Sequence, residues 1–247
     1  MRTVYLLSGE LDCFFSAVFL AYKDATAWLC SAPFWQGCIG ETVVEVVTDA
    51  EKSARVVRKI QSIDANALFD VQTILRSSAS DGEQTAYLYV KELVKTDRVV
   101  RGKLSVECVR RAMDLRAQVL YEAHRLKGFL RFSETVGGAM YAPCSPDHDV
   151  LELLLPHFVD RLRGIPFAIH DVRRGKAALY NGVESQLVNV GNADILPSER
   201  EKAIAELWKK YYRTVNIPDR KNERQRKGYM PKRYWQFLTE EPGRDEP

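Results

Sequence analysis

Histidine and carboxylate side chains are concentrated in one stretch of this 247-residue chain. All four histidines lie between residues 124 and 170, a segment that we call the histidine window. Histidine titrates near neutral pH, and a carboxylate beside it can orient the ring, so such pairs are typical of general acid–base catalysis. The candidate catalytic residues are His148, His170, Asp147, Asp149 and Asp171.

Two other interpretations of the histidine window are open. Imidazole and carboxylate groups also bind zinc, manganese or iron. However, no two histidines have the i, i+4 spacing of a helical metal motif. His148 and His157 would lie about 13 Å apart along a helix that rises about 1.5 Å per residue. We therefore expect no metal ion and no other cofactor. The second alternative is a buried polar network that joins strands and helices without catalysis.

Three arginines accompany these acids. Arg131 lies in a predicted strand, and Arg173 and Arg174 follow His170 in a predicted turn. A guanidinium group can bind a phosphate through two parallel hydrogen bonds. It can equally form salt bridges with the neighbouring aspartates, so the sequence leaves both roles open.

The segment from residue 200 to residue 233, which we call the basic tail, carries twelve Lys or Arg against four acids. Its net charge is +8, whereas the whole chain has a net charge of +3. Cations neutralise phosphates and rings such as Trp208 and Tyr229 stack on unpaired bases, so the pattern favours DNA or another polyanion. The alternative is a solvated charged surface with the aromatic residues in the core. The expected phosphate-binding residues of the tail are Arg220, Lys221, Arg224, Arg226, Lys227, Lys232 and Arg233.

The composition is that of a folded globular protein, with 46% hydrophobic and 28% charged residues. The five cysteines include no C-x-x-C pair, so neither a disulfide framework, a zinc ribbon nor an iron–sulfur cluster is indicated. No signal peptide and no apolar run of membrane-spanning length is recognisable. We therefore expect a cytoplasmic protein with no membrane partner.

The pattern of apolar residues predicts an α+β fold. Residues 1–127 are expected to form a helical N-terminal half with short strands, and residues 241–247 a disordered tail. Residues 128–240 are expected to form an antiparallel hairpin–helix–hairpin unit followed by a basic C-terminal helical segment. In this second half, strands are predicted at 129–133, 139–143, 166–170 and 176–180, with a helix that starts within 145–149 and carries Pro146 in its first turn.

Several motifs of the second half resemble an uncharacterised bacterial family whose members are labelled probable DNA metabolism proteins. The motifs are Gly128-Phe-Leu-Arg-Phe132, Pro146-Asp-His-Asp-Val-Leu151, Pro156-His-Phe158, Ile169-His-Asp171, Leu179-Tyr-Asn-Gly182 and Met230-Pro-Lys-Arg-Tyr-Trp235. In that family the gene commonly accompanies a radical SAM protein of DNA modification or repair. A related region also occurs fused to uracil-DNA-glycosylase-like domains. Ser8-Gly9-Glu10 and Asn181 depart from the more acidic residues expected of the family.

The resemblance implies a setting in DNA repair or modification. We therefore expect a nucleic-acid-binding accessory protein whose partners are DNA and a radical SAM-type or glycosylase-type repair protein. The alternative is a hydrolase or phosphodiesterase that acts on nucleic acid or nucleotide through the His, Asp and Arg residues of the histidine window. A scaffold that binds only protein is a third interpretation.

Overall fold

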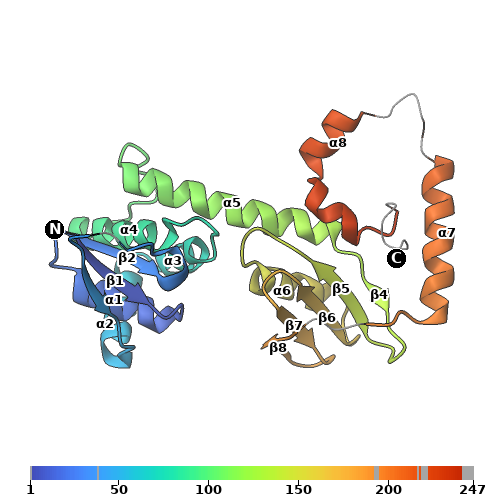
Figure 1. The fold of residues 1–247 in the computed structure, drawn as a ribbon, viewed down its shortest axis with the longest axis horizontal. Helices are drawn as coiled ribbons and strands as arrows, with labels where there is room; N and C mark the ends of the chain where they lie inside the picture. Colours follow the sequence, from blue (N-terminus) through green and yellow to red (C-terminus); the bar gives the residue numbers. More distant parts are fainter. Residues whose placement is uncertain (1, 38, 192–194, 216, 218–221, 241–247) are drawn as a thin grey trace. The chain divides into compact units, whose positions relative to one another are not determined.

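The computed structural model describes residues 2–37, 39–191, 195–215, 217 and 222–240. Over these residues the chain has mixed helices and strands (Figure 1), which confirms the predicted α+β class. It divides into two compact units, Met1–Tyr121 (unit 1) and Glu122–Pro247 (unit 2), and the division falls inside one long helix. Among the described helices, none has the length and hydrophobicity required to span a bilayer.

The elements of the first half, through the helix that crosses the division, are β1 (Thr3–Leu7), α1 (Leu11–Ala21), β2 (Ala27–Ser31), η1 (Ala32–Phe34), β3 (Thr42–Glu45), α2 (Ala50–Ile63), α3 (Ala67–Leu75), α4 (Gly82–Thr96) and α5 (Glu107–Phe129). Those that follow are β4 (Ser133–Glu134), β5 (Met140–Cys144), α6 (Leu151–Arg161), β6 (Phe167–Asp171), β7 (Lys176–Tyr180), β8 (Ser185–Asn189), α7 (Glu199–Val215), α8 (Glu223–Tyr229) and η3 (Lys232–Phe237).

Unit 1 is built on a three-stranded parallel sheet in the order β2–β1–β3. The sequence did not predict β2, which pairs with β1 from Thr3 opposite Ala27. Asp49 caps α2, because its carboxylate accepts hydrogen bonds from the backbone N–H groups of Glu51 and Lys52 at 3.1 and 3.0 Å. The core of the unit contains the aromatic rings of Phe14, Phe15, Tyr87 and Tyr89.

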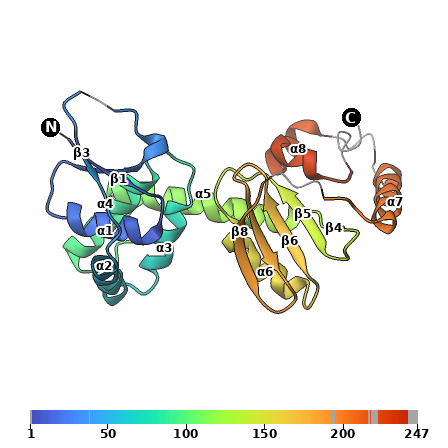
Figure 2. The same ribbon diagram turned by 60° about the horizontal axis from the view of Figure 1, so that its bottom comes forward.

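Unit 2 is built on a five-stranded sheet in the order β4–β5–β6–β7–β8 (Figure 2). β4 and β5 form one antiparallel hairpin, and β6 and β7 form the second, as the hairpin–helix–hairpin prediction requires. The two hairpins meet in a parallel pair, β5 with β6, so the expectation of a wholly antiparallel sheet is corrected at this position. A parallel pair needs a crossover connection, and α6 supplies it while it covers one face of the sheet.

The core of unit 2 lies between α6 and the covered face. Phe132 contacts Phe158 of α6 with ring centroids 5.0 Å apart and Phe167 of β6 at 5.8 Å. Phe167 in turn contacts Tyr180 of β7 at 5.2 Å. Because side chains alternate along a strand, the residues of β6 at 167, 169 and 171 face this core, and His170 faces the other side.

Two predicted boundaries in unit 2 are wrong for identifiable reasons. The strand expected at 129–133 is reduced to Ser133–Glu134, because α5 continues to Phe129 and the N–H of Leu130 still donates to Leu126. The helix expected to start within 145–149 starts at Leu151. In the connecting loop, side chains from other elements satisfy the backbone polar groups of residues 146–148, so these groups do not enter a helix.

β8 was not predicted, and α8 was predicted only as part of a basic C-terminal helical segment without bounds of its own. β8 is an exposed edge strand without regular alternation of apolar and polar residues, so it lacks the usual pattern of a strand. α8 is a short charged helix in the basic tail, and its first turn is fixed by Asn222, whose side chain accepts a hydrogen bond from the N–H of Gln225 at 3.0 Å.

Gly175, in the turn between β6 and β7, provides a test of this sheet. Its φ is +62°, and a Cβ at this position would lie 2.9 Å from the carbonyl oxygen of Val190. We predict that Gly175→Ala lowers the free energy of unfolding by about 1–3 kcal/mol, since both left-handed backbone and the close contact disfavour a side chain. Chemical denaturation measures this. Gly137→Ala is the matched control, because its Cβ would meet only Thr135 at 3.9 Å. Equal stability of the two variants would contradict the turn geometry.

Candidate functional site

The histidine window is organised around a buried carboxylate of α5. Glu122 is 4% exposed and accepts hydrogen bonds from the backbone N–H groups of Asp147 (3.0 Å) and His148 (2.7 Å). It also accepts from the hydroxyl of Tyr234 (2.7 Å) and from the guanidinium of Arg233 (3.0 Å). Burial alone would raise the pKa of the Glu122 carboxyl. The hydrogen bonds together lower this pKa by more than burial raises it, so the net pKa lies below its ordinary value. Glu122 is therefore held as a carboxylate.

A second buried carboxylate lies at the end of β6. Asp171 is fully buried and accepts from the backbone N–H groups of Arg173 (3.1 Å) and Arg174 (3.2 Å). The guanidinium of Arg174 donates to the Asp171 carboxylate at 2.8 Å, to the carbonyl of Pro146 at 3.0 Å and to the carbonyl of Asp147. Arg174 thus ties the β6–β7 turn to the loop before α6.

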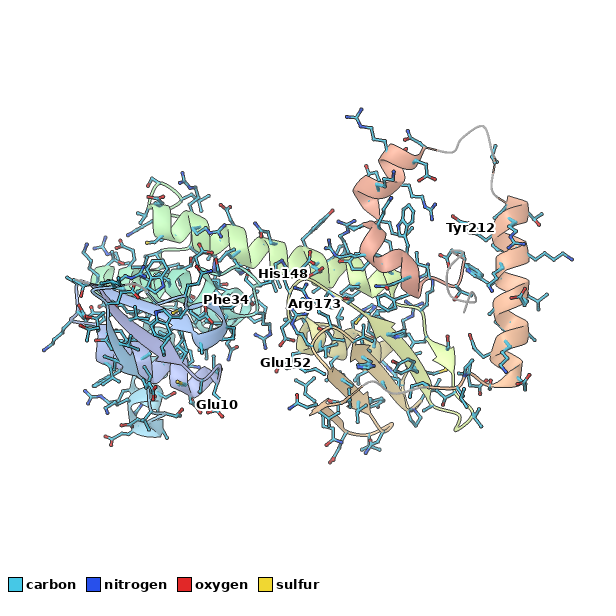
Figure 3. All side chains as sticks on the ribbon, in the orientation of Figure 1. Glu10, Phe34, His148, Glu152, Arg173 and Tyr212 are labelled. Atoms are coloured by element: carbon cyan, nitrogen blue, oxygen red, sulfur yellow. The ribbon has the colours of Figure 1, made fainter. Side chains whose placement is uncertain are left out.

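The remaining charged groups of this loop pair at the surface. The carboxylate of Asp147 lies 3.0 Å from Arg233 and 3.7 Å from Arg173, and Asp149 lies 2.8 Å from Lys176. Figure 3 shows Arg173 and His148 at the same end of the unit 2 sheet. We call Glu122, Asp147, Asp171, Arg174 and Arg233 the carboxylate–arginine network.

His148 joins this network through its backbone N–H, and its ring is half-buried. Burial lowers the pKa of the His148 ring. The carboxylates of Glu122 and Asp147 oppose that effect, and the net pKa is below its usual value. The ring is therefore neutral at pH 7, a state in which one ring nitrogen can accept a proton.

His170 lies apart from the network. Its Nδ1 is 2.8 Å from the hydroxyl of Tyr141 on β5, and its backbone carbonyl accepts a weak hydrogen bond from the thiol of Cys144 at 3.5 Å. Its Nε2 is buried without a hydrogen-bond partner among the described residues. Burial lowers the pKa of the His170 ring as well, so this ring is also neutral at pH 7.

The structure thus divides what the sequence placed in one polar cluster. Asp147, His148 and Asp171 are brought together through Arg174. Arg131 donates instead to the carbonyl of Gly128 at 3.0 Å and pairs with Glu240 at 2.9 Å. His170 pairs with Tyr141, as described above. In the part of the chain that the structure describes, no three His, Cys, Asp or Glu side chains are arranged to hold a metal ion.

The described cations among the expected phosphate-binding residues of the basic tail fall into two groups. Arg233 binds Glu122, and Arg226 stacks over the Trp235 ring at 4.1 Å. The second group comprises the exposed residues Arg224, Lys227 and Lys232, none of which forms an ion pair with another described residue. Arg220 and Lys221 lie outside the described residues.

Sequence reasoning missed three residues of these clusters. Tyr141 and Tyr234 carry no local signal, because each gains its role from a partner far along the chain. Glu122 could have been found. It lies three residues after buried Val119 and four before buried Leu126, so it interrupts the apolar face of α5 with a charge. A carboxylate in such a position requires partners.

Residues 80–240 match a family described as a domain of unknown function, DUF4130, and this range is well over half of the chain. The chain belongs to the DUF4130 family. The whole carboxylate–arginine network and the exposed cations of the basic tail lie inside the DUF4130 region, whereas β1 to β3 lie before it. No curated protein matches the chain. No solved structure matches it.

Removing the charge of Glu122 tests the network. Glu122→Gln keeps the length of the side chain but leaves Arg233 without its buried partner and replaces an acceptor oxygen with a donor. We predict a loss of about 2–3 kcal/mol in the free energy of unfolding at pH 7, because the buried donors around Glu122 lose their charged acceptor. The matched control is Glu199→Gln, at an exposed ion pair with Lys202, which should change stability by less than about 0.5 kcal/mol.

The same pair of proteins gives a pH test. The folded-state pKa of Glu122 lies below the ordinary glutamate value of 4.5, so its stabilisation is complete above that value. It is lost as the pH falls through the folded-state pKa. The stability difference between wild type and Glu122→Gln should therefore be constant from neutral pH down to about 5 and shrink below 4.5. A difference that grows on acidification would contradict the network.

Proposed function

We propose that this member of the DUF4130 family is a nucleic-acid-binding accessory protein of DNA repair or modification that acts with a partner enzyme. The observation that carries the proposal is the exposed cationic surface of α8 and η3, formed by Arg224, Lys227, Tyr229 and Lys232. Arg224 and Lys227 are one helical turn apart, and Tyr229 between the cations is 70% exposed. We call these four residues the cationic strip.

The chemistry of the cationic strip suits single-stranded or unpaired nucleic acid. Lysine and arginine replace the counterions of phosphate groups and bind without regard to sequence. An exposed tyrosine ring offers a stacking surface to any base, since every base has a π face. The Tyr229 ring is 70% exposed, so its face is accessible to a base.

Residues of α5 and of the segment itself hold the strip in place. Arg125 of α5 donates to the carbonyls of Gly228 and Tyr229. Arg226 and Trp235 stack on each other, and the indole N–H of Trp235 donates to the carbonyl of Met230 at 3.0 Å. Because these contacts order the backbone before a ligand arrives, binding requires less further ordering of the chain.

The DNA setting and the class of partner come from the resemblance to probable DNA metabolism proteins. We propose a radical SAM-type or glycosylase-type repair enzyme as the partner. The alternative, a hydrolase or phosphodiesterase, would use His148 and His170 on one substrate. The two side chains take different partners, Tyr141 for His170 and the carboxylate–arginine network around His148, so the geometry favours the accessory role.

The cationic strip can be tested by its salt dependence. We predict that the protein binds a single-stranded oligonucleotide at low salt and that the logarithm of its affinity falls linearly with the logarithm of the salt concentration. Replacing Arg224, Lys227 and Lys232 together with Gln should reduce the steepness of this line by about 2, at about 0.7 per lost phosphate contact. Fluorescence anisotropy measures both quantities.

The matched control replaces three exposed cations of unit 1, Lys95, Arg98 and Lys103, with Gln. It removes the same total charge and should leave the slope within experimental error of wild type. Equal effects of the two triple variants would show that only net charge matters. Absence of oligonucleotide binding at low salt would refute the proposed function.

The partner can be tested with purified components. We predict that the protein alone leaves oligonucleotides intact and that a DNA-modifying radical SAM enzyme or repair glycosylase works several-fold faster in its presence. The Gln triple variant of the cationic strip should lose this stimulation, whereas His148→Ala should keep most of it. Cleavage of DNA by the protein alone, abolished by His148→Ala, would establish the hydrolase instead.

A further inference from the structure

α7 faces the sheet of unit 2 with its polar side. Figure 1 shows α7 beside β4, and the two elements are in contact. The apolar residues Ile204, Leu207, Trp208, Tyr211 and Val215 form one stripe of this helix, and all of them are exposed. The opposite side, with Glu201, Ala205 and Lys209, lines a cavity of about 550 Å³. An amphipathic helix normally does the reverse, and buries its apolar stripe.

The cavity has the size of a small-molecule site. Ligand pockets typically enclose about 300–1,000 Å³. The walls are Ser133 and Thr135 of the first hairpin, Tyr141 of β5, Thr239 after η3 and the inward side of α7. Four hydroxyl groups therefore surround the space. That of Thr135 donates to the carbonyl of Ala139 at 2.9 Å and that of Tyr141 is hydrogen-bonded to His170, so these two offer a ligand mainly acceptor capacity.

The charges in the walls balance one another. Two carboxylates, Glu201 and Glu206, balance two ammonium groups, Lys202 and Lys209. Lys209 is committed to Glu206 at 2.9 Å and its side chain is only 18% exposed, and Lys202 pairs with Glu199 at 2.6 Å. Glu206 is paired with Lys209 in the same way, and Glu201 accepts a hydrogen bond from the backbone N–H of Glu134 at 3.1 Å, so the wall offers a phosphate no uncommitted cation. A neutral ligand with mixed donors and acceptors fits the lining better.

Tyr141 gives the cavity a fixed aromatic wall. Its hydroxyl is 2.8 Å from Nδ1 of the buried His170, which holds the ring at one orientation. A flat ligand can pack on such a ring, while the hydroxyl groups around it meet the edge of the ligand. Nucleobases are flat, neutral, and carry donors and acceptors side by side on their edges.

We propose that this cavity binds one unpaired nucleobase of the nucleic acid whose phosphates bind the cationic strip. The proposal rests on the proposed function and deepens it. Tyr141 is the ring on which the base packs, and His170 acts as a positioning residue for Tyr141. The polar side of α7 then faces inward because it completes the hydrogen-bonding wall around the base. Binding of the base requires its removal from any stack, which is easiest in a single strand or at a mismatch.

The test uses the full-length protein and the four free 2′-deoxynucleosides, observed by saturation-transfer NMR. Wild type should bind at least one of them. Ala205→Phe places a ring in the cavity from α7 and should abolish the signal. The matched control is Ala203→Phe, on the same helix but outside the cavity lining, and it should bind like wild type. Should Ala205→Phe fail to fold, Thr239→Trp fills the cavity from the opposite wall. No nucleoside binding by wild type, or binding unchanged in the filled variant, overturns the proposal.

Oligonucleotide binding separates this failure from failure of the proposed function. Ala205→Phe should lower the affinity for a single-stranded oligonucleotide several-fold. It should leave the salt dependence of the affinity unchanged, because the phosphate contacts remain. Replacing one base of the oligonucleotide with an abasic site should lower its affinity for wild type but not for Ala205→Phe. Equal affinities of wild type and Ala205→Phe for both oligonucleotides would refute the base pocket but leave the proposed role of the cationic strip unaffected. Loss of all oligonucleotide binding, including that of wild type at low salt, would refute both.

Discussion

Taking a carboxylate out of water is unfavourable unless protein donors replace the lost water molecules. Unit 2 meets this condition at Glu122, where two backbone N–H groups, a tyrosine hydroxyl and a guanidinium surround one side chain. The donors come from two segments, the loop before α6 and η3. Hydrogen bonds to this one carboxylate hold both segments against α5. The cationic strip includes Lys232 of η3, and the cavity is lined by Thr239, which follows η3.

The arginines of unit 2 differ in the partners that they take. Arg131, Arg174 and Arg233 each bind a carboxylate that is buried or nearly so, and such a guanidinium has few donors left for a ligand. Arg224 is exposed and extends from α8 without a described carboxylate beside it. The sequence leaves the two roles equal, because a count of charges does not show which acids are buried. The structure shows which of these arginines have a buried carboxylate as a partner, and a buried carboxylate needs its cation.

Local patterns allowed much of the fold to be predicted. The strand at 176–180, the cap at Asp49 and the order hairpin–helix–hairpin all follow from short-range periodicity and turn residues. The parallel pairing of β5 with β6 could not be predicted, because hairpin signals concern neighbouring strands only. The late start of α6 was missed for a similar reason. The N–H groups that would enter the helix are bound by Glu122, about 25 residues earlier in the chain.

The candidate site was predicted in its location but not in its connections. Asp147, His148 and Asp171 do lie near one another, whereas His170 faces the other side of β6 because side chains alternate along a strand. The position of Arg131 depends on where α5 ends, and that end was misplaced by the strand predicted at 129–133. An error of a few residues at an element boundary therefore moves a charged side chain from one cluster to another.

The hydrogen bond between Glu122 and Tyr234 joins residues 112 positions apart. At about 5–20 residues per second, a ribosome needs roughly 6–20 s to add the chain between them. During that interval α5 can form, but its carboxylate lacks two of its four donors and must remain hydrated. Unit 1 has its complete sequence by then, so it can fold while unit 2 is still being made. The end of the basic tail therefore supplies the last donors to Glu122, and the same segment contributes exposed cations to the surface of unit 2.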